Sequence, residues 1–347
     1  MSIVARSTDA EGIAAGFRAA GLAAEVEAPF GALTTYGVGG TAALMVEVVD
    51  AEDARSVGRV MSAHPGTEVF VLGNGSNTLV ADDGFDGVVV RTRPPRDPSA
   101  FSVQVVDGKV SVGSWMPLPV LARRSVAAGA HGLEWAVGVP GTVGGAVRMN
   151  AGGHGAEMVD SLVSVSLVSL VTGTSAEVPA AGLGLHFRGS AIGPAHLVVR
   201  ATFAVTPPDG HDGEADLAAI VAWRREHQPG GRNAGSVFVN PAPGEGSAGA
   251  LIDAAGVRGR TVGGATVSEK HANFIQAGTG ATAADVVALM QEVQDEVRER
   301  TGTVLRSEVR MVGFGPAVTA RFAGESHDDP AVVAARKGLA LMLGETA

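Results

Sequence analysis

The chain contains no cysteine among its 347 residues. Disulfide bridges, thiolate metal ligands and a cysteine nucleophile are therefore excluded. The nine histidines show no spacing typical of a metal site, because neither an HExxH nor an HxH pattern occurs. We therefore expect no metal ion in this protein.

Long apolar runs are also missing, since no segment reaches the roughly 18 to 20 residues that a membrane-spanning helix needs. The first residues, MSIVARSTDAEG, have no apolar core of the kind found in secretion signals. Lysine is scarce, with only Lys109, Lys270 and Lys337, and the net charge is −10 at pH 7. We therefore expect a cytoplasmic protein that spans no membrane and binds no nucleic acid.

Glycine, in contrast, is abundant, and eight of the 49 glycines lie in the stretch 132–155, GLEWAVGVPGTVGGAVRMNAGGHG. Apolar residues are interleaved with these glycines, whereas a flexible linker would be polar. Glycines among apolar residues indicate tight turns in which the backbone closely approaches another group. Two interpretations remain open here: a phosphate-rich ligand lying on the main chain, or a glycine-rich buried corner of a β-rich domain.

A second glycine-rich loop runs from Gly73 to Asn77 with the sequence GNGSN. It is not a dinucleotide-binding GxGxxG turn, because Thr78 replaces the third glycine and the residues that follow do not predict a helix. We expect a strand on each side of this loop. Its N–H groups and the side chains of Ser76 and Asn77 would face an anion.

The remaining pattern predicts an α+β protein in several parts. Helices are expected at 13–22, 50–63, 117–130, 217–227 and 282–301, the last with an apolar stripe and a capping pair at Thr282 and Asp285. Hairpins are expected around Asp107-Gly108 and Thr172-Gly173, and a strand over 304–314. We predict a helical lead-in (1–28), two α+β lobes (29–95 and 96–205), a C-terminal α+β domain (206–314) and a polar linker with a terminal helix (315–347).

Six motifs occur in the order seen in the UDP-N-acetylenolpyruvoylglucosamine reductases, which the chain resembles from Leu33 to Phe314. They are GVGGTA, VLGNGSNTLVADDGFDGVVVR, GLEWAVGVPGTVGGAVRMNAGGHGAEM, AGSVFVNP, GGATVSEKHANF and SEVRMVGF. Their spacing is similar to the shorter subtype of this family of flavoenzymes. The resemblance implies an FAD-binding domain of the vanillyl-alcohol-oxidase (PCMH) type, made of two α+β lobes, followed by a C-terminal α+β substrate domain.

The resemblance also implies the cofactors and the site. FAD would be bound non-covalently, NADPH would donate the hydride, and the protein would act as a monomer on a UDP-sugar. The FAD contacts implied are Tyr36, Gly73, Asn74, Gly75, Ser76, Asn77, Val139, Pro140, Gly141, Thr142, Gly144, Gly145, Ala146, Asn150 and Ala151. The catalytic residues implied are Ser236, Arg188 and Glu308, and the substrate contacts are Asn240, Asn273 and Arg188.

Each implied catalytic residue suits one requirement of enol-ether reduction in cell-wall precursor synthesis. Ser236 would donate the proton, Arg188 would hold the carboxylate of the substrate, and Glu308 would polarise the enol or relay a proton. Two other hypotheses stay open: a flavin oxidase or dehydrogenase of the same fold acting on another substrate, and a paralogue that binds flavin or a UDP-sugar without turnover.

Three features depart from the family pattern. Phe187 stands where the family often has tyrosine, and Val239 replaces the lysine of an FKNP motif. Both changes bear on substrate affinity, because a hydroxyl and a positive charge are lost. The chain also continues from Phe314 to Ala347, beyond the point where many members end.

Overall fold

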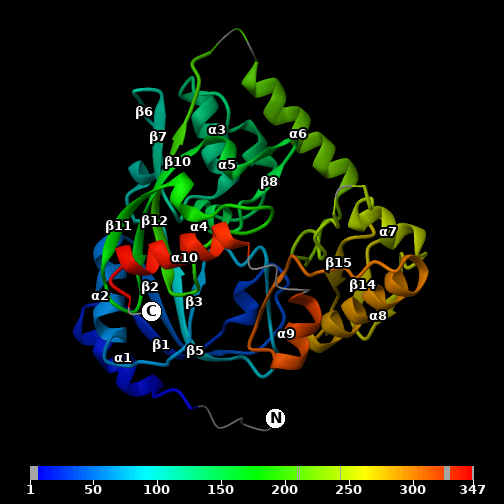
Figure 1. Cartoon of the computed structure of the whole chain (residues 1–347), viewed down its shortest axis with the longest axis horizontal. Helices are drawn as coiled ribbons and strands as arrows, with labels where there is room; N and C mark the ends of the chain where they lie inside the picture. Colours follow the sequence, from blue (N-terminus) through cyan, green and yellow to red (C-terminus); the bar gives the residue numbers. More distant parts are fainter. Residues whose placement is uncertain (1–6, 209, 211, 243, 324–328, 346–347) are drawn as a thin grey trace.

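The structure is a computed structural model that describes residues 7–208, 210, 212–242, 244–323 and 329–345. It consists of two α+β lobes, a C-terminal α+β domain beside them, and a terminal helix that lies across the second lobe (Figure 1). None of the described helices is long and apolar enough to cross a membrane.

The first lobe is built on a four-stranded sheet with the order β1-β2-β5-β3. The strands are β1 (Ala24–Ala28), β2 (Ala42–Val48), β3 (Val69–Leu72) and β5 (Phe85–Thr92), and the helices α1 (Ala10–Ala19) and α2 (Ala51–Met61) pack on one face. The strands β2, β5 and β3 run parallel, and their valine-rich sequences suit a sheet that is buried on both faces. Because β1 pairs with β2, the segment before residue 29 is part of this lobe.

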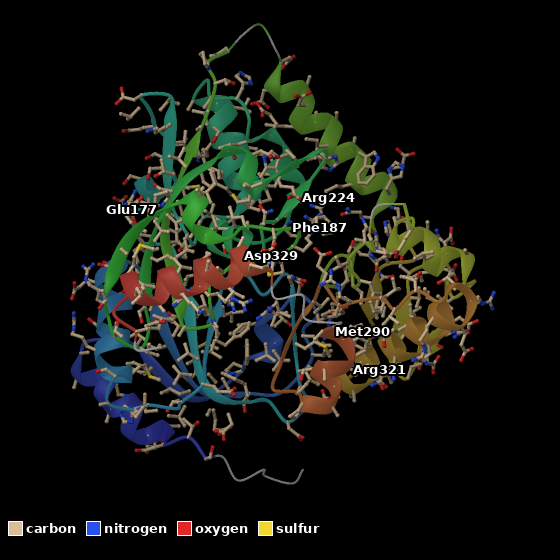
Figure 2. All side chains as sticks on the ribbon, in the orientation of Figure 1. Glu177, Phe187, Arg224, Met290, Arg321 and Asp329 are labelled. Carbon is tan, nitrogen blue, oxygen red and sulfur yellow. The ribbon has the colours of Figure 1, made fainter. Side chains whose placement is uncertain are left out.

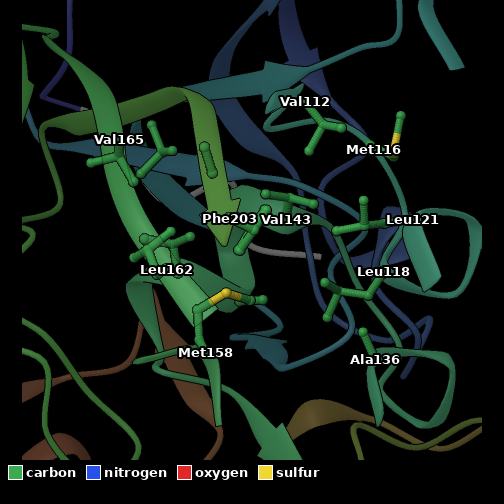
Figure 3. Packing of buried hydrophobic residues seen from close by; sticks show 14 of the residues in the cluster. Val112, Met116, Leu118, Leu121, Ala136, Val143, Met158, Leu162, Val165 and Phe203 are labelled. Carbon is green, nitrogen blue, oxygen red and sulfur yellow. The ribbon is translucent and has the colours of Figure 1, made fainter. Parts of the chain in front are cut away.

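The second lobe is an antiparallel sheet with the order β11-β10-β12-β7-β6. Its strands are β6 (Val105–Val106), β7 (Lys109–Gly113), β10 (Leu162–Ser169), β11 (Ser175–Pro179) and β12 (His196–Ala204). Both predicted hairpins are confirmed, since β6 pairs with β7 and β10 with β11. The helices α3 (Leu118–Ala127), α4 (Val143–Arg148) and α5 (Met158–Ser161) contribute to one apolar core with this sheet (Figure 3).

The stretch 132–155 folds into short elements rather than turns alone. It contains the 3-10 helix η3 (Glu134–Gly138), the helix α4 and the small strand β8 (Gly152–Gly153), which pairs with β9 (Ala156–Glu157). The helix α4 was not predicted, because its six residues include two glycines and show no helical period.

The C-terminal domain packs the helix α8 (Ala283–Thr301) against a three-stranded sheet. Its elements are α7 (Ala248–Ala254), β13 (Thr261–Val262), β14 (Ala265–Val267), β15 (Ile275–Ala277), α8 and α9 (Pro316–Ala323). The capping box of Thr282 and Asp285 and the buried stripe of α8 are as predicted. The helix α6 (Gly213–His227) links this domain to the second lobe (Figure 1).

Three contacts fix the C-terminal domain to the first lobe. The strand β16 (Arg310–Val312) pairs in parallel with β4 (Thr78–Val80), which follows the GNGSN loop. The carboxylate of Asp82 accepts hydrogen bonds from the first two N–H groups of α8. The guanidinium of Arg232 donates to the carbonyls of Tyr36 and Gly37. The prediction of one long strand over 304–314 is therefore wrong, since only 310–312 is strand and its partner is β4.

The tail holds two packed helices where a polar linker and one helix were expected. Phe322 of α9 is buried in the core of the C-terminal domain. The second helix, α10 (Pro330–Met342), buries Val332 and Leu339 in the core of the second lobe. Residues 324–328 of the expected linker lie outside the described residues.

Candidate active site

The two glycine-rich loops contact each other. The hydroxyl of Ser76 donates a hydrogen bond to the carbonyl of Pro140 over 3.3 Å. A Cβ on Gly141, whose φ is +116°, would lie 2.7 Å from the Ser76 Oγ. A Cβ on Gly75, with φ +62°, would lie 2.7 Å from the Cα of Thr34. Glycine is therefore required here because protein segments approach each other, a reason that the sequence did not reveal.

The loop 73–77 offers a row of free backbone donors. In the described part of the chain, the N–H groups from Gly73 to Asn77 donate no hydrogen bond, although the carbonyl of Gly75 accepts one from Thr35. Successive N–H groups that point to one side form a concavity that binds anions. The donors of this loop therefore fit a diphosphate such as that of FAD.

Most N–H groups of the second loop are used inside the protein, whereas those of Gly141 and Thr142 donate no hydrogen bond within the described part of the chain. Val143 and Gly144 donate to the carbonyls of Met116 and Ser114, and Gly145 donates to the Thr142 hydroxyl. The N–H groups of Val139, Ala146, Asn150 and Ala151 are likewise bonded to carbonyls of their own segment. Within the described chain, the first loop therefore presents five free N–H groups and the second loop presents two, at Gly141 and Thr142.

Arg188 lies at the tip of a tight turn in the second lobe. His186 and Gly189 exchange two backbone hydrogen bonds of 3.0 Å, which leaves Phe187 and Arg188 at the tip. Arg188 has a φ of +59°, a left-handed conformation that is unfavourable for a residue with a side chain. Such a conformation persists only where the surrounding contacts impose it.

The guanidinium of Arg188 is held between two carboxylates. Its Nε lies 3.1 Å from the Oε1 of Glu308, and its Nη1 lies 3.1 Å from the Oε1 of Glu157. Arg188 and Glu157 belong to the second lobe, whereas Glu308 belongs to the C-terminal domain. The ion pair therefore forms only when these two parts of the fold come together.

Glu308 is fixed through its backbone on two sides. Its N–H donates to the carbonyl of Val237 over 2.8 Å, and its carbonyl accepts from the Asn77 side chain over 3.0 Å. Burial raises the pKa of the Glu308 carboxyl, and the positive charge of Arg188 opposes part of this rise. Glu308 thus holds a proton more readily than an ordinary glutamate.

Ser236 precedes Val237 directly, so the bond to Val237 brings Ser236 and Glu308 onto neighbouring segments. Within the described chain the hydroxyl of Ser236 has no hydrogen-bond partner in the protein. The side chain is therefore available to a ligand.

Asn150 connects the glycine-rich stretch 132–155 to the turn of Arg188. Its amide nitrogen donates to Glu157 over 2.9 Å and to the carbonyl of His186 over 3.1 Å, and its amide oxygen accepts from the N–H of Val159. The side chain is buried and fully bonded. Its amide therefore positions Glu157 and the base of the turn, a role that the resemblance did not imply.

Asn273 and Tyr36 are placed inside the protein. The amide of Asn273 accepts from the N–H of Phe238 and donates to its carbonyl, over 2.9 and 2.8 Å. The Tyr36 ring is fully buried in the core of the C-terminal domain, its hydroxyl has no partner, and burial raises its pKa. Asn240 is exposed and its side-chain oxygen accepts from the N–H of Ala248.

Two further arginines at this site were missed by the sequence reasoning. Burial and, to a smaller extent, the nearby charge of Arg310 together lower the pKa of Arg148, at the end of α4, to about 10. Burial of the guanidinium also lowers the pKa of Arg310, although the residue as a whole is exposed. Neither guanidinium has a partner among the described residues. Arg310 lies only two residues after Glu308 in the sequence, and this closeness was a usable signal.

The charges at the site favour an anionic ligand. Arg188 is paired with Glu157 and Glu308, and Arg148 and Arg310 lie on adjoining segments, since the carbonyl of Arg148 accepts from Ser190 and Arg310 follows Glu308 by two residues. These five side chains carry a net positive charge even when both carboxylates are ionised. A cavity of about 520 Å³ elsewhere, between the two lobes and lined by Arg55, Trp115 and Arg200 among others, shares no residue with this site. We assign it no role.

Comparisons with known proteins agree with this architecture. A family model described as an FAD binding domain matches residues 42–178, and one described as the C-terminal domain of UDP-N-acetylenolpyruvoylglucosamine reductase matches residues 227–312. The fold and the donor loop thus define a flavoprotein of the FAD-binding class with a second domain that completes the site.

Relatives identify the family within this class. The reductase of Synechococcus sp. (strain WH7803) is 39% identical over 294 residues, which is 82% of this chain and 92% of the relative. The reductase of Anaeromyxobacter sp. (strain Fw109-5) is 40% identical over 83% of this chain and 88% of its own length. The crystal structure of the reductase from Thermus caldophilus has a TM-score of 0.69 at 33% identity and covers 84% of this chain and 98% of that one. The chain belongs to the UDP-N-acetylenolpyruvoylglucosamine reductase family, as its sequence predicted.

Proposed function

We propose that this protein reduces UDP-N-acetylenolpyruvoylglucosamine to UDP-N-acetylmuramate, with FAD as cofactor and NADPH as hydride donor, in peptidoglycan precursor synthesis. The observation that carries the proposal is the ion pair of Arg188 and Glu308, which joins the FAD-binding part and the reductase-type C-terminal domain. Membership of the reductase family supports the choice of substrate.

The free N–H groups of the loop 73–77 bind the diphosphate of FAD. When bound, FAD supplies the hydride that it receives from NADPH. The chain contains no cysteine, and the His154 side chain lies against Trp223, with ring centroids 5.1 Å apart. We therefore infer that FAD is bound non-covalently. When the protein is precipitated with acid, the flavin absorbance should be found in the supernatant and not in the precipitate.

Arg188 binds the carboxylate of the enolpyruvyl group. Its planar guanidinium already holds two carboxylates in the structure, so its geometry suits the carboxylate of a substrate. Glu308 shares this guanidinium, and a proton retained on Glu308 would reduce its repulsion of the substrate carboxylate.

Ser236 donates the proton that the α-carbon of the substrate requires after hydride has reached the β-carbon. Its hydroxyl is free of protein partners and its segment is bonded to that of Glu308. A serine hydroxyl is a weak acid, so the donation depends on close positioning and on the positive charge nearby.

Separation of the two half-reactions tests the proposal. The purified yellow protein is mixed anaerobically with NADPH and then with UDP-N-acetylenolpyruvoylglucosamine, and the flavin absorbance is followed by stopped flow. Bleaching by NADPH and recovery on addition of the substrate is the expected result. Absence of recovery in the wild-type protein would refute the proposed substrate.

The variant Ser236→Ala tests the proton donor in the same assay. Reduction by NADPH should be unchanged, whereas reoxidation should slow by about 10²- to 10⁴-fold, as for other removed proton donors. The variant Arg188→Lys should slow reoxidation as well, because a point charge does not reproduce the planar fork. Reoxidation of Ser236→Ala at the wild-type rate would show that the serine is not the donor.

We also propose that the enzyme is cytoplasmic and monomeric, since a UDP-sugar and NADPH are intracellular metabolites and the proposed site uses residues of one chain only. Light scattering coupled to gel filtration measures the mass directly, and a dimer mass would contradict the proposal.

A further inference from the structure

The terminal helix α10 lies beyond the part of the chain that the family models match, and it packs beside the turn that carries Arg188. Figure 1 shows this helix lying across the second lobe, away from the C-terminal domain that precedes it. In the view of Figure 2, the labels of Asp329, at the start of α10, and of Phe187, in the turn, lie close together near the middle of the picture.

The helix presents a continuous apolar stripe to the second lobe. Val332, Ala335, Leu339 and Leu343 recur at spacings of three and four residues, which places them on one face. Val332, Leu339 and Leu343 are buried in the core of the lobe, and Ala335 packs against that core. Leu341, on another face, is 78% exposed.

One segment that this stripe covers is the base of the Arg188 turn. Leu183 accepts a hydrogen bond from the N–H of Ala191 over 2.8 Å, and this pair closes the loop that contains Arg188. A Cβ placed on Gly184 would lie 2.9 Å from the Cβ of Ala335 and 3.5 Å from the Cα of Val332. The backbone of α10 therefore runs directly over Gly184.

The opposite side of the same loop is hydrogen-bonded to the glycine-rich stretch 132–155. Ser190 donates to the carbonyl of Arg148 over 2.7 Å, and Asn150 donates to the carbonyl of His186 over 3.1 Å. The loop is thus held between α4 with Asn150 on one side and α10 on the other. The contacts on these two sides can together hold the backbone of Arg188 in its left-handed conformation.

The end of α10 is anchored by polar contacts. The carboxylate of Glu345 accepts from the hydroxyl of Ser169 over 2.7 Å and lies 3.1 Å from the Nε2 of His196. The Nδ1 of His196 accepts from the N–H of Gly193, so its proton is on Nε2 and is donated to Glu345. Thr172 donates to the carbonyl of Leu343 over 2.8 Å. The helix is therefore fixed along its length.

We infer that α10 is a positioning element of the active site, which holds the Arg188 turn in the geometry that receives the substrate carboxylate. The inference rests on the proposed function for its kinetic consequence. Residues of α10, Ala335 in particular, act through the Leu183–Ala191 base and contact no reacting atom.

A pair of matched variants tests the inference. Ala335→Ile introduces a branched side chain against Gly184, whereas Ala334→Ile places the same side chain at an exposed position of the same helix. We expect Ala335→Ile to raise the KM for the enolpyruvyl substrate by about ten- to a hundred-fold, as misplacement of a binding group does. FAD content and the rate of reduction by NADPH should stay within about twofold of Ala334→Ile, because the contacts described for α10 are made with the second lobe, whereas the loop 73–77 belongs to the first.

A second pair loosens the helix instead of crowding it. Leu339→Ala removes buried contacts of α10, and Leu341→Ala is its exposed control. Hydrogen exchange at residues 184–191 should speed up in Leu339→Ala and Ala335→Ile but not in the controls, while the loops 73–77 and 141–151 keep their rates.

The outcomes are distinct. Unchanged substrate KM and unchanged exchange at 184–191 in both variants would overturn the inference. Loss of FAD in both variants would overturn it as well, since α10 would then support the whole lobe. If the wild-type protein were not reoxidised by the substrate, the proposed function would fail, and selective exchange at 184–191 would still support the positioning role.

Discussion

The variant Asn273→Ala separates a positioning role from direct substrate binding. The Asn273 side chain is 4% exposed, and its two hydrogen bonds pair the N–H and the carbonyl of Phe238, which is itself 1% exposed. Alanine would leave two buried backbone groups without partners, at about 1–3 kcal/mol each, so we expect a loss of about 2–6 kcal/mol in unfolding free energy.

Urea unfolding of the FAD-loaded protein, followed by far-UV circular dichroism, measures this loss. Asn240→Ala is the matched control, because Asn240 is exposed and water can replace its single bond to Ala248, which should cost less than about 1 kcal/mol. Reoxidation should slow in Asn273→Ala, since the segment of Ser236 leads directly into Phe238.

The reasoning would be refuted by a variant Asn273→Ala as stable as Asn240→Ala but with a raised KM for the UDP-sugar. That result would make Asn273 a direct substrate ligand, as the family resemblance implied.

Three further predictions concern charge and backbone at the site. Because the pKa of Glu308 is raised, the rate of flavin reoxidation should fall as the pH rises through that pKa. Stopped-flow measurements over a range of pH should show this fall in the wild-type protein. In Glu308→Gln the fall should be absent and the rate of reoxidation should be lower. Gly75→Val should lower the unfolding temperature of the apoprotein as well as FAD retention, because its side chain would meet Thr34; an unchanged temperature would mean that only the cofactor space is filled. Arg148→Met should stabilise the apoprotein by about 1 kcal/mol through relief of an unpaired charge, yet weaken FAD or substrate binding, and calorimetry measures both effects.

Local features of the sequence were sufficient for much of the fold. The apolar period and caps of α8, the Asp107-Gly108 turn and the absence of a helix after GNGSN depend on contacts between residues close in the chain, and all three predictions are confirmed. The order of six motifs sufficed for the family, because each motif constrains residue type and spacing together.

Long-range contacts decided the rest. Gly75 makes room for Thr34 and Gly141 makes room for Ser76, and nothing local distinguishes this from room for a ligand. Asn150 and Asn273 are polar residues inside the motifs that carry the resemblance. The amide of Asn150 is bonded to Glu157, Val159 and His186, up to 36 positions away, and that of Asn273 is bonded to Phe238, 35 positions away. Periodicity carries no information about such partners.

The sequence by itself determined the family, the two glycine-rich loops and the identities of Ser236, Arg188 and Glu308 as candidates. Only the tertiary structure placed Arg188 between Glu157 and Glu308, brought the charges of Arg148 and Arg310 near each other, and laid α10 on the turn that carries Arg188. The physical reason is that a charge or a packed helix acts over a few ångströms in space, and the residues that meet here are separated by up to 162 positions in the chain (Arg148 and Arg310), a distance that only folding removes.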